Sequence, residues 1–258
     1  MAGPPDVFAP AQLGPVRLRN RIIKAATFEG VTPDALVSER LIAFHRAVAE
    51  GGAAMSTVAY LAVSPEGRTH KEQIYLREAA LPGLRRLTGA VHEAGAAIAA
   101  QIGHAGPVAN GRSNGAQAIA ASAMPSPLSL QMIRSATEAD LKRITAAYAH
   151  GARLAVRAGF DALEIHLGHG YLLSSFLSPN LNRRRDSYGR TLQRRAAFPR
   201  LVVRTVRDAV GGSVAITAKI NMSDGTRKGL KTEESIEFAN LLQSDGCLDA
   251  LQLSAEAP

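Results

Sequence analysis

The sequence predicts an α/β fold with one parallel sheet, and three observations support that prediction. Short apolar runs typical of buried strands alternate with longer runs in which apolar residues recur at helical spacing. The strand-like runs are far enough apart to be joined by crossover helices, as parallel strands require. The chain has 258 residues and is 46% hydrophobic and 20% charged, which is enough to build one sizeable core. We therefore expect a single domain over residues 1–258.

The first half of the chain supplies three of the predicted strands. Ser38 can cap the first helix because its side chain accepts a hydrogen bond from a backbone N–H, and Gly95 closes the second helix. A long loop rich in Gly, Ser, Asn and Pro follows the third strand, over residues 103–136. The strands are expected at 22–26, 53–62 and 97–102, and the helices at 39–49 and 81–94.

The second half continues the same alternation. Thr137 is expected to cap the third helix, since Glu138 and Asp140 place carboxylates in its first turn. Pro199 falls inside the fourth helical run, where we expect a kink or a restart. The helices are expected at 138–158, 192–210 and 232–244, and the strands at 161–166, 214–220 and 249–254.

Six strands separated by five helices favour a (βα)8 TIM-barrel type of fold that is incomplete, with about six of its eight strands present. No Gly-x-Gly-x-x-Gly follows the first strand, which disfavours a Rossmann domain. The chain ends at Ala255 to Pro258, shortly after the sixth strand. We therefore expect a barrel truncated after strand six, whose first and last strands have unpaired edges.

The segment from Glu164 to Tyr171 is the strongest candidate for a functional site. It leaves the C-terminal end of a buried strand and carries His166, His169 and Tyr171, although the whole chain has only seven His and five Tyr. Barrels of this type keep their chemistry at that end of their strands. Two imidazoles can hold a developing oxyanion or a metal ion, and a phenol can deliver a proton. The alternative is that these are ordinary polar groups at a strand end.

Two other strand ends carry polar groups that should meet at the same rim. Gln101 closes the third strand, followed by His104 and two glycines that let a ligand approach the backbone. Lys219 and Asn221 close the fifth strand. Taken singly, Gln101 could cap a loop and Lys219 could be a solvated charge. Their convergence with His166 favours a shared ligand site.

The charge balance bears on possible partners. The chain has 30 Lys and Arg against 22 Asp and Glu, a formal net charge of +8 at pH 7. The basic residues are scattered apart from runs at 183–185 and 194–195, and no aromatic residues are interleaved to stack bases. We therefore expect a small-molecule substrate rather than a nucleic acid, and homo-oligomer formation stays open.

The cysteine content and the N-terminus bear on the compartment. Cys247 is the single cysteine, which excludes an internal disulfide and is typical of a buried structural thiol. Residues 1–20 contain four prolines and no long apolar run, and no stretch reaches membrane-spanning length. We expect a cytoplasmic protein without a membrane partner.

The same residues resemble the old yellow enzyme family of FMN-dependent oxidoreductases, over nearly the whole chain. The block from His166 to Tyr171 is similar to the active-site turn of that family, and the block from Gln101 to Gly106 is similar to its third-strand motif. The first strand is entered through a similar segment at 20–23, and the loop after the active-site turn continues the likeness through 176–179, 182–184 and 186–189.

The resemblance implies a role for each candidate residue. FMN would be the cofactor, with Gln101 bonding the polar edge of the flavin pyrimidine ring and Lys219 placing a positive charge near N1 and O2. NADH or NADPH would give a hydride that passes through FMN to the β-carbon of an α,β-unsaturated carbonyl compound. His166 and His169 would bind the carbonyl oxygen, and Tyr171 would supply the proton.

Two features depart from the family pattern. The family's first-strand motif usually ends in Pro, a short hydrophobic residue, and Thr or Cys facing the flavin, whereas this chain reads Ala25, Ala26, Thr27, Phe28. Ala26 and Thr27 are the candidates for cofactor contact here, although counting from Asn20 places Phe28 at the last position. In the family, backbone amides after strands seven and eight hold the FMN phosphate, and the predicted barrel stops before them.

Two other functions remain open from the sequence. The chain could be a non-catalytic homologue or fragment that acts through protein contacts. It could also be a metal-dependent barrel hydrolase, because Glu164, His166 and His169 are residue types that ligate zinc. The hydrolase alternative leaves Gln101 and Lys219 without a role, so no metal is expected in the preferred interpretation.

Overall fold

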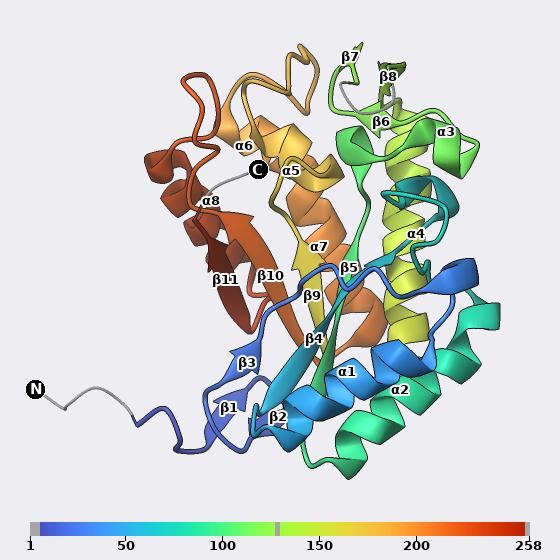
Figure 1. The fold of residues 1–258 in the computed structure, drawn as a ribbon. Coiled ribbons are helices and arrows are strands. Elements are labelled where there is room, and N and C mark those ends of the chain that lie inside the picture. Colours follow the sequence, from blue (N-terminus) through green and yellow to red (C-terminus); the bar gives the residue numbers. More distant parts are fainter. Residues whose placement is uncertain (1–5, 127–129, 256–258) are drawn as a thin grey trace, which may run out of the picture.

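The structure is a computed structural model that describes residues 6–126 and 130–255, so residues 256–258 of the chain end discussed above lie outside it. In this part of the chain, six strands run parallel in one sheet, in the spatial order β11-β10-β9-β5-β4-β3 (Figure 1). Each strand lies beside the strand of this sheet that follows it in the sequence, so the order never reverses as it does in a doubly wound sheet. The sheet is therefore an incomplete (βα)8 barrel, as predicted. Its strands are β3 (Ile23–Lys24), β4 (Met55–Ala62), β5 (Ala97–Gly103), β9 (Ala162–His166), β10 (Ala215–Asn221) and β11 (Ala250–Ser254).

Helices cover the outer face of the sheet (Figure 1). Ser38 and Thr137 cap their helices as expected; the Ser38 hydroxyl accepts a hydrogen bond from the Leu41 amide, and Thr137 and Asp140 form a reciprocal capping box. The fourth helical run is broken, but at Ala196 and not at Pro199. Pro199 is accommodated in the first turn of the second piece, where its missing N–H would have no intrahelical partner. The helices are α1 (Glu39–Glu50), α2 (Leu81–Glu93), α3 (Gly111–Asn114), α4 (Glu138–Arg157), α5 (Leu172–Leu177), α6 (Leu192–Arg195), α7 (Ala197–Val210) and α8 (Thr232–Asp245).

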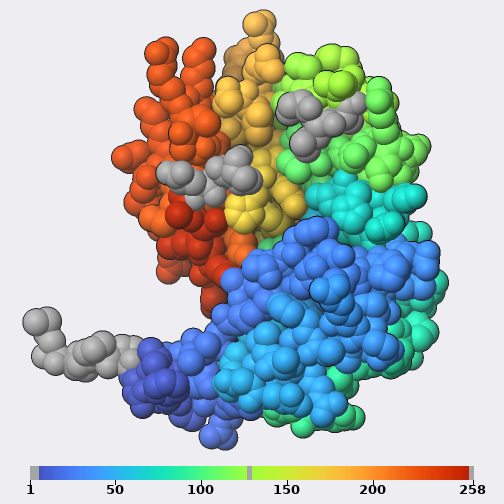
Figure 2. All heavy atoms as spheres, in the orientation of Figure 1, coloured from blue at the N-terminus to red at the C-terminus, as the bar shows by residue number. Residues whose placement is uncertain are grey.

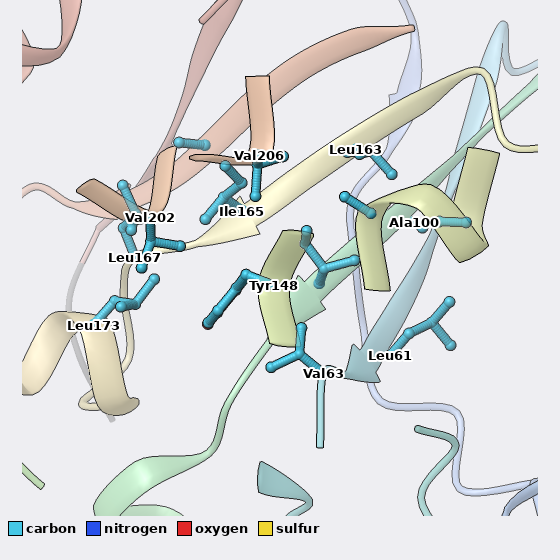
Figure 3. Packing of buried hydrophobic residues seen from close by; sticks show 14 of the residues in the cluster. Leu61, Val63, Ala100, Tyr148, Leu163, Ile165, Leu167, Leu173, Val202 and Val206 are labelled. Atoms are coloured by element: carbon cyan, nitrogen blue, oxygen red, sulfur yellow. The ribbon is translucent and has the colours of Figure 1, made fainter. Parts of the chain in front are cut away.

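The main core lies between the sheet and this helical layer (Figure 3). Successive side chains of a strand point to opposite faces, so β9 sends Leu163 and Ile165 outward and Glu164 and His166 toward the barrel interior. Ile165 packs beside α7 in Figure 3, and the fully buried Tyr148 of α4 lies in the same cluster. The strand that carries the candidate site is thus fixed by apolar contacts on its other face.

The bottom of the barrel is closed by a hairpin of β1 (Ala11–Leu13) and β2 (Val16–Leu18), which the sequence patterns did not predict. Its apolar side chains pack against Met55 and against small inner-face residues of β5, β9 and β10. The turn of the hairpin lies against Asp249, the residue just before the last strand: a Cβ on Gly14 would lie 2.6 Å from Cγ of Asp249. In the space-filling view the N-terminal segment, blue, accordingly borders the red C-terminal strand (Figure 2).

The two outer strands of the sheet have exposed edges, as expected for an incomplete barrel. Ile23 of β3 is 41% exposed and Leu253 of β11 is 60% exposed. The long loop between β5 and α4 contains more structure than its composition indicates, because it forms a separate three-stranded sheet. That sheet consists of β6 (Ile119–Ala120), β7 (Met124–Pro125) and β8 (Met132–Ser135).

The structure also bears on the single cysteine, the two basic runs and the expected absence of a membrane span. Cys247 is buried and its Sγ donates to the carbonyl of Asp245, which fits a structural thiol. In each basic run, one arginine is held by contacts within the fold. Arg184 donates to two loop carbonyls and to Asp186, and Arg195 forms an ion pair with Glu234. No helix in the described ranges is long and apolar enough to cross a membrane.

Candidate active site

A pocket of about 370 Å³ opens at the C-terminal ends of the strands. Its volume is in the range of small-molecule and cofactor sites. All the residues singled out from the sequence as catalytic or cofactor-binding line it. They are Ala26, Thr27, Gln101, His166, His169, Tyr171 and Lys219. Phe28, which occupies the last position of the family's first-strand motif when counted from Asn20, lines it as well.

Strand register explains how the polar groups meet. Gln101 of β5 lies opposite Glu164 of β9, and Lys219 of β10 lies opposite His166. Side chains two residues apart share a face, so Glu164 and His166 both point into the barrel. The sheet therefore brings an amide, a carboxylate, a cation and an imidazole to one inner surface.

Glu164 forms a buried link between two of the pocket residues. Gln101 Nε2 donates to Glu164 Oε1 at 2.6 Å, and Lys219 Nζ lies 3.4 Å from the same oxygen. Burial raises the pKa of Glu164, while Lys219 and Gln101 act in the opposite direction. The sequence interpretation considered Glu164 only as a zinc ligand. The available signal was a carboxylate in an otherwise apolar buried strand, since such a group is almost always paired.

The two histidines form a directed chain of hydrogen bonds. The Gly168 amide donates to His166 Nδ1 at 3.2 Å, so the proton of the neutral His166 ring is on Nε2. His166 Nε2 then donates to His169 Nδ1 at 3.1 Å, and His169 Nε2 donates to Ser254 Oγ at 2.8 Å. Burial, and then the positive charge of Lys219, lower the pKa of His169. Burial also lowers the pKa of His166, so both rings are neutral donors at pH 7.

The turn that carries His169 has an unusual backbone. His169 has a φ of 57°, in the left-handed region that few non-glycine residues occupy. The Asn221 side chain holds this turn by accepting a hydrogen bond from the His169 amide at 3.0 Å. A Cβ at Gly168 would lie 2.6 Å from the same Asn221 oxygen, so glycine is required there. Asn221, noted at the end of the fifth predicted strand, therefore holds the turn in place.

Tyr171 lies just before α5 and stacks on His166. The two ring centroids are 4.3 Å apart with an angle of 16° between the planes. Tyr60 contacts Tyr171 edge-on at 5.2 Å. Burial raises the pKa of Tyr171 to about 12, so its hydroxyl keeps its proton at neutral and moderately alkaline pH.

Sequence reasoning missed part of the pocket wall and misplaced one residue. Tyr60, Thr69 and His70 also line the pocket. Tyr60 sits in an apolar strand that reads as core, and the other two lie in a loop without a recognisable pattern. His104, expected at the rim, is buried away from the pocket, with its Nε2 4.0 Å from a carboxylate oxygen of Glu66. Its burial lowers the pKa of His104 to about 4.

The pocket suits the polar edge of a flavin. With Nε2 of Gln101 bound to Glu164, its Oε1 is left as an acceptor, and the Lys219 ammonium is a donor beside it. The pyrimidine edge of FMN presents the complement, an N3–H donor next to the N1 and O2 acceptors. The aromatic and apolar side chains on the wall suit a flat ring.

The residues considered as zinc ligands do not converge. Glu164 faces Gln101 and Lys219, whereas His166 and His169 bond to each other. Within residues 6–126 and 130–255, no three His, Cys, Asp or Glu side chains are placed to hold a metal ion. The geometry therefore gives no support to the hydrolase alternative.

Comparisons with known proteins agree with this geometry. The family model described as NADH:flavin oxidoreductase / NADH oxidase family matches residues 6–252. The chain is 57% identical over 250 residues to the 4,4'-dithiodibutanoate disulfide reductase of Rhodococcus erythropolis, over 97% of this chain and 62% of that protein. It is 32% identical over 254 residues to the NADPH dehydrogenase of Geobacillus thermodenitrificans (strain NG80-2), over 97% of this chain and 73% of that protein. The structure of morphinone reductase in complex with tetrahydroNAD is similar with a TM-score of 0.88 and 25% identity, over 97% of this chain and 74% of that one.

These matches differ in how much of the relative they cover. The chain spans 62% of the disulfide reductase, and only 36% and 39% of two further relatives. The family model nevertheless matches almost all of this chain. The chain belongs to the NADH:flavin oxidoreductase / NADH oxidase family.

Proposed function

We propose that this protein is an FMN-dependent oxidoreductase that passes a hydride from NADH or NADPH, through FMN, to the activated C=C bond of an α,β-unsaturated carbonyl compound. FMN and a nicotinamide co-substrate follow from the family and its relatives. The observation that carries the proposal is one pocket of about 370 Å³ shared by Gln101 and Lys219 with His166, His169 and Tyr171. In this proposal residues 1–258 act as a single FMN-binding barrel domain.

The proposed division of labour follows from the chemistry of the side chains. Bound FMN supplies the hydride chemistry that no amino-acid side chain offers. Gln101 and Lys219 hold its polar edge, and Ala26 and Thr27 border the ring. A flavin seated in this pocket would displace water from beside the polar groups, which would strengthen each electrostatic contact made there.

His166 and His169 are proposed to bind the substrate carbonyl oxygen. Their lowered pKa values make them neutral N–H donors, and such donors stabilise an oxygen that gains negative charge. One donor of this kind typically lowers the barrier by about 3 kcal/mol. In this structure the N–H of His166 is bound to His169 and the N–H of His169 is bound to Ser254, so the carbonyl oxygen must compete with both hydrogen bonds.

Tyr171 is proposed to protonate the α-carbon. Its pKa of about 12 keeps the hydroxyl protonated, and stacking on His166 places it beside the carbonyl site. Positioned proton transfer of this type contributes a factor of about 10² to 10⁴ in rate.

A second candidate reaction is favoured by one specific observation, the 57% identity to a protein named 4,4'-dithiodibutanoate disulfide reductase. Hydride transfer to a disulfide breaks the S–S bond, leaves one sulfur as a thiol and releases the other as a thiolate. A thiol has a pKa of about 8.5, so a thiolate leaves without help from an acid. The same pocket could therefore support this reaction without using Tyr171.

The first test is retention of FMN and turnover of both substrate types. The purified chain is incubated with excess FMN, desalted and examined by visible spectroscopy, then assayed anaerobically with NADH or NADPH and either 2-cyclohexenone or a dialkyl disulfide. Retained flavin and enone turnover are the expected results. Retained flavin with turnover of the disulfide alone would replace the first reaction by the second, and loss of the flavin would contradict both.

A further inference from the structure

Glu164 lies between two cavities and does not line the active-site pocket itself. It borders a second cavity of about 190 Å³ in the barrel interior, together with Thr57 and Thr217. Only 4% of Glu164 is exposed. Its position one layer below the pocket means that it affects a ligand there only through the residues above it.

Glu164 decides which end of the Gln101 amide faces the pocket. A carboxylate only accepts hydrogen bonds, so the amide must turn Nε2 toward it and leave Oε1 as the free end. In the described chain no group donates to Gln101 Oε1. The reverse orientation would set two oxygen acceptors against each other in a buried site, which is strongly unfavourable.

The same carboxylate oxygen also anchors Lys219. The Nζ of Lys219 lies 3.4 Å from Glu164 Oε1, and the lysine is only 5% exposed. Opposite charges at this distance attract each other more strongly in a buried site than in water. Glu164 therefore supplies both a hydrogen-bond acceptor for Gln101 and a negative charge for Lys219.

We propose that Glu164 is a positioning residue that sets Gln101 as an acceptor and Lys219 as a charged donor toward the pyrimidine edge of the flavin. The inference rests on the proposed function and deepens it. The two contributions are separable, because hydrogen-bond acceptance governs the Gln101 amide and charge governs the field at the flavin. Affinity for FMN should therefore depend on whether residue 164 accepts the Gln101 hydrogen bond, and the reduction potential should depend on its charge.

Three variants separate these contributions. Glu164→Gln keeps an acceptor oxygen but removes the charge, and Glu164→Met removes both. Thr217→Val is the matched control, since Thr217 lies opposite Glu164 in the same layer and borders the lower cavity but not the pocket. Each protein is stripped of flavin, and its dissociation constant for FMN is measured by quenching of flavin fluorescence. The midpoint potential of each reconstituted protein is measured with a reference dye.

The expected pattern differs between the two readouts. Glu164→Met should weaken FMN binding about tenfold, the value of one well-placed hydrogen bond, whereas Glu164→Gln should stay within about threefold of the wild type. Both should raise the midpoint potential, because the positive charge of Lys219 is then uncompensated and favours the negative charge that FMN gains on reduction. In a Gln101→Ala background, Glu164→Met should have little further effect on affinity, since the two residues act as one unit.

A probe on the unmodified protein keeps the inference testable even if a variant fails to fold. FMN methylated at N3 has no N3–H, and it should bind the wild type at least tenfold more weakly than FMN does. Equal binding of the two flavins would overturn the acceptor role of Gln101. Glu164 variants that match Thr217→Val in affinity and potential would overturn the inference while leaving the proposed function intact. A wild-type chain that cannot be reconstituted with FMN would overturn both.

Discussion

Replacing Tyr171 with Phe should separate the two candidate reactions. The change removes only the hydroxyl and keeps the ring that stacks on His166 at 4.3 Å, so the pocket should keep its shape. Reduction of an enone needs a proton at the α-carbon, and its rate should fall by a factor of about 10² to 10⁴. That loss corresponds to about 3 to 5 kcal/mol of barrier. Cleavage of a disulfide should be nearly unaffected, because a thiolate leaves without a proton.

The assay compares both substrates on the same reconstituted enzyme, with NADPH oxidation followed anaerobically from about pH 7 to about pH 10. The pKa of about 12 for Tyr171 means that wild-type enone reduction should show no loss from tyrosine ionisation over this range. Tyr60→Phe is the control, since Tyr60 contacts Tyr171 but its hydroxyl donates to the Gly67 carbonyl at 2.8 Å. An equal loss with both substrates, or an unchanged enone rate, would refute the assignment of Tyr171 as the proton donor.

Three further predictions concern stability. Lys219→Met removes the charge that opposes the raised pKa of Glu164, so in the variant this pKa rises further above the unfolded value of about 4.3. The folded state then holds the Glu164 proton more tightly than the unfolded chain, and stability is lost as pH rises from the unfolded pKa to the folded one. Urea unfolding should therefore show a larger loss relative to the wild type at about pH 8 than at about pH 5, and an equal loss would contradict this. Thr137→Ala removes the cap of α4, and its free energy of unfolding in urea should fall by about 1 kcal/mol; an unchanged value would show that the cap is dispensable. Gly106→Ala should lower the Tm by far more than Gly115→Ala, because both glycines have positive φ but only at Gly106 would a Cβ lie 2.5 Å from a backbone Cα. Similar Tm values for these two variants would mean that the backbone relaxes around the added methyl group.

The order and bounds of the main strands could be predicted from the sequence because each is a short, mostly apolar run between turn residues. All six lie within two residues of the predicted bounds. The hairpin at Ala11–Leu18 could not be found, since strands of three residues carry no periodic signal and are stabilised by contacts with the barrel bottom. The break at Ala196 was placed at Pro199 because proline is the obvious helix breaker, yet a helix tolerates proline in its first turn.

The candidate site was predictable where its residues follow a strand directly. Gln101, His166 and Lys219 occupy strand positions whose direction follows from alternation, so their convergence could be inferred. His104 could not be placed in the same way, because it comes after β5 has ended and the backbone turns it away from the pocket. His70 reaches the pocket from a loop, whose path depends on tertiary contacts that no local pattern reveals.

The left-handed backbone at His169 also limits how this turn can change by mutation. Residues with a branched Cβ are strongly disfavoured at a φ of 57°, whereas Asn and Asp tolerate it better than most. Both are one nucleotide away from either histidine codon. Of the two, only Asn keeps a neutral N–H donor. The imidazole at this position can thus be exchanged for an amide in a single mutational step that leaves the turn intact, while most other replacements must first overcome the strain of the backbone.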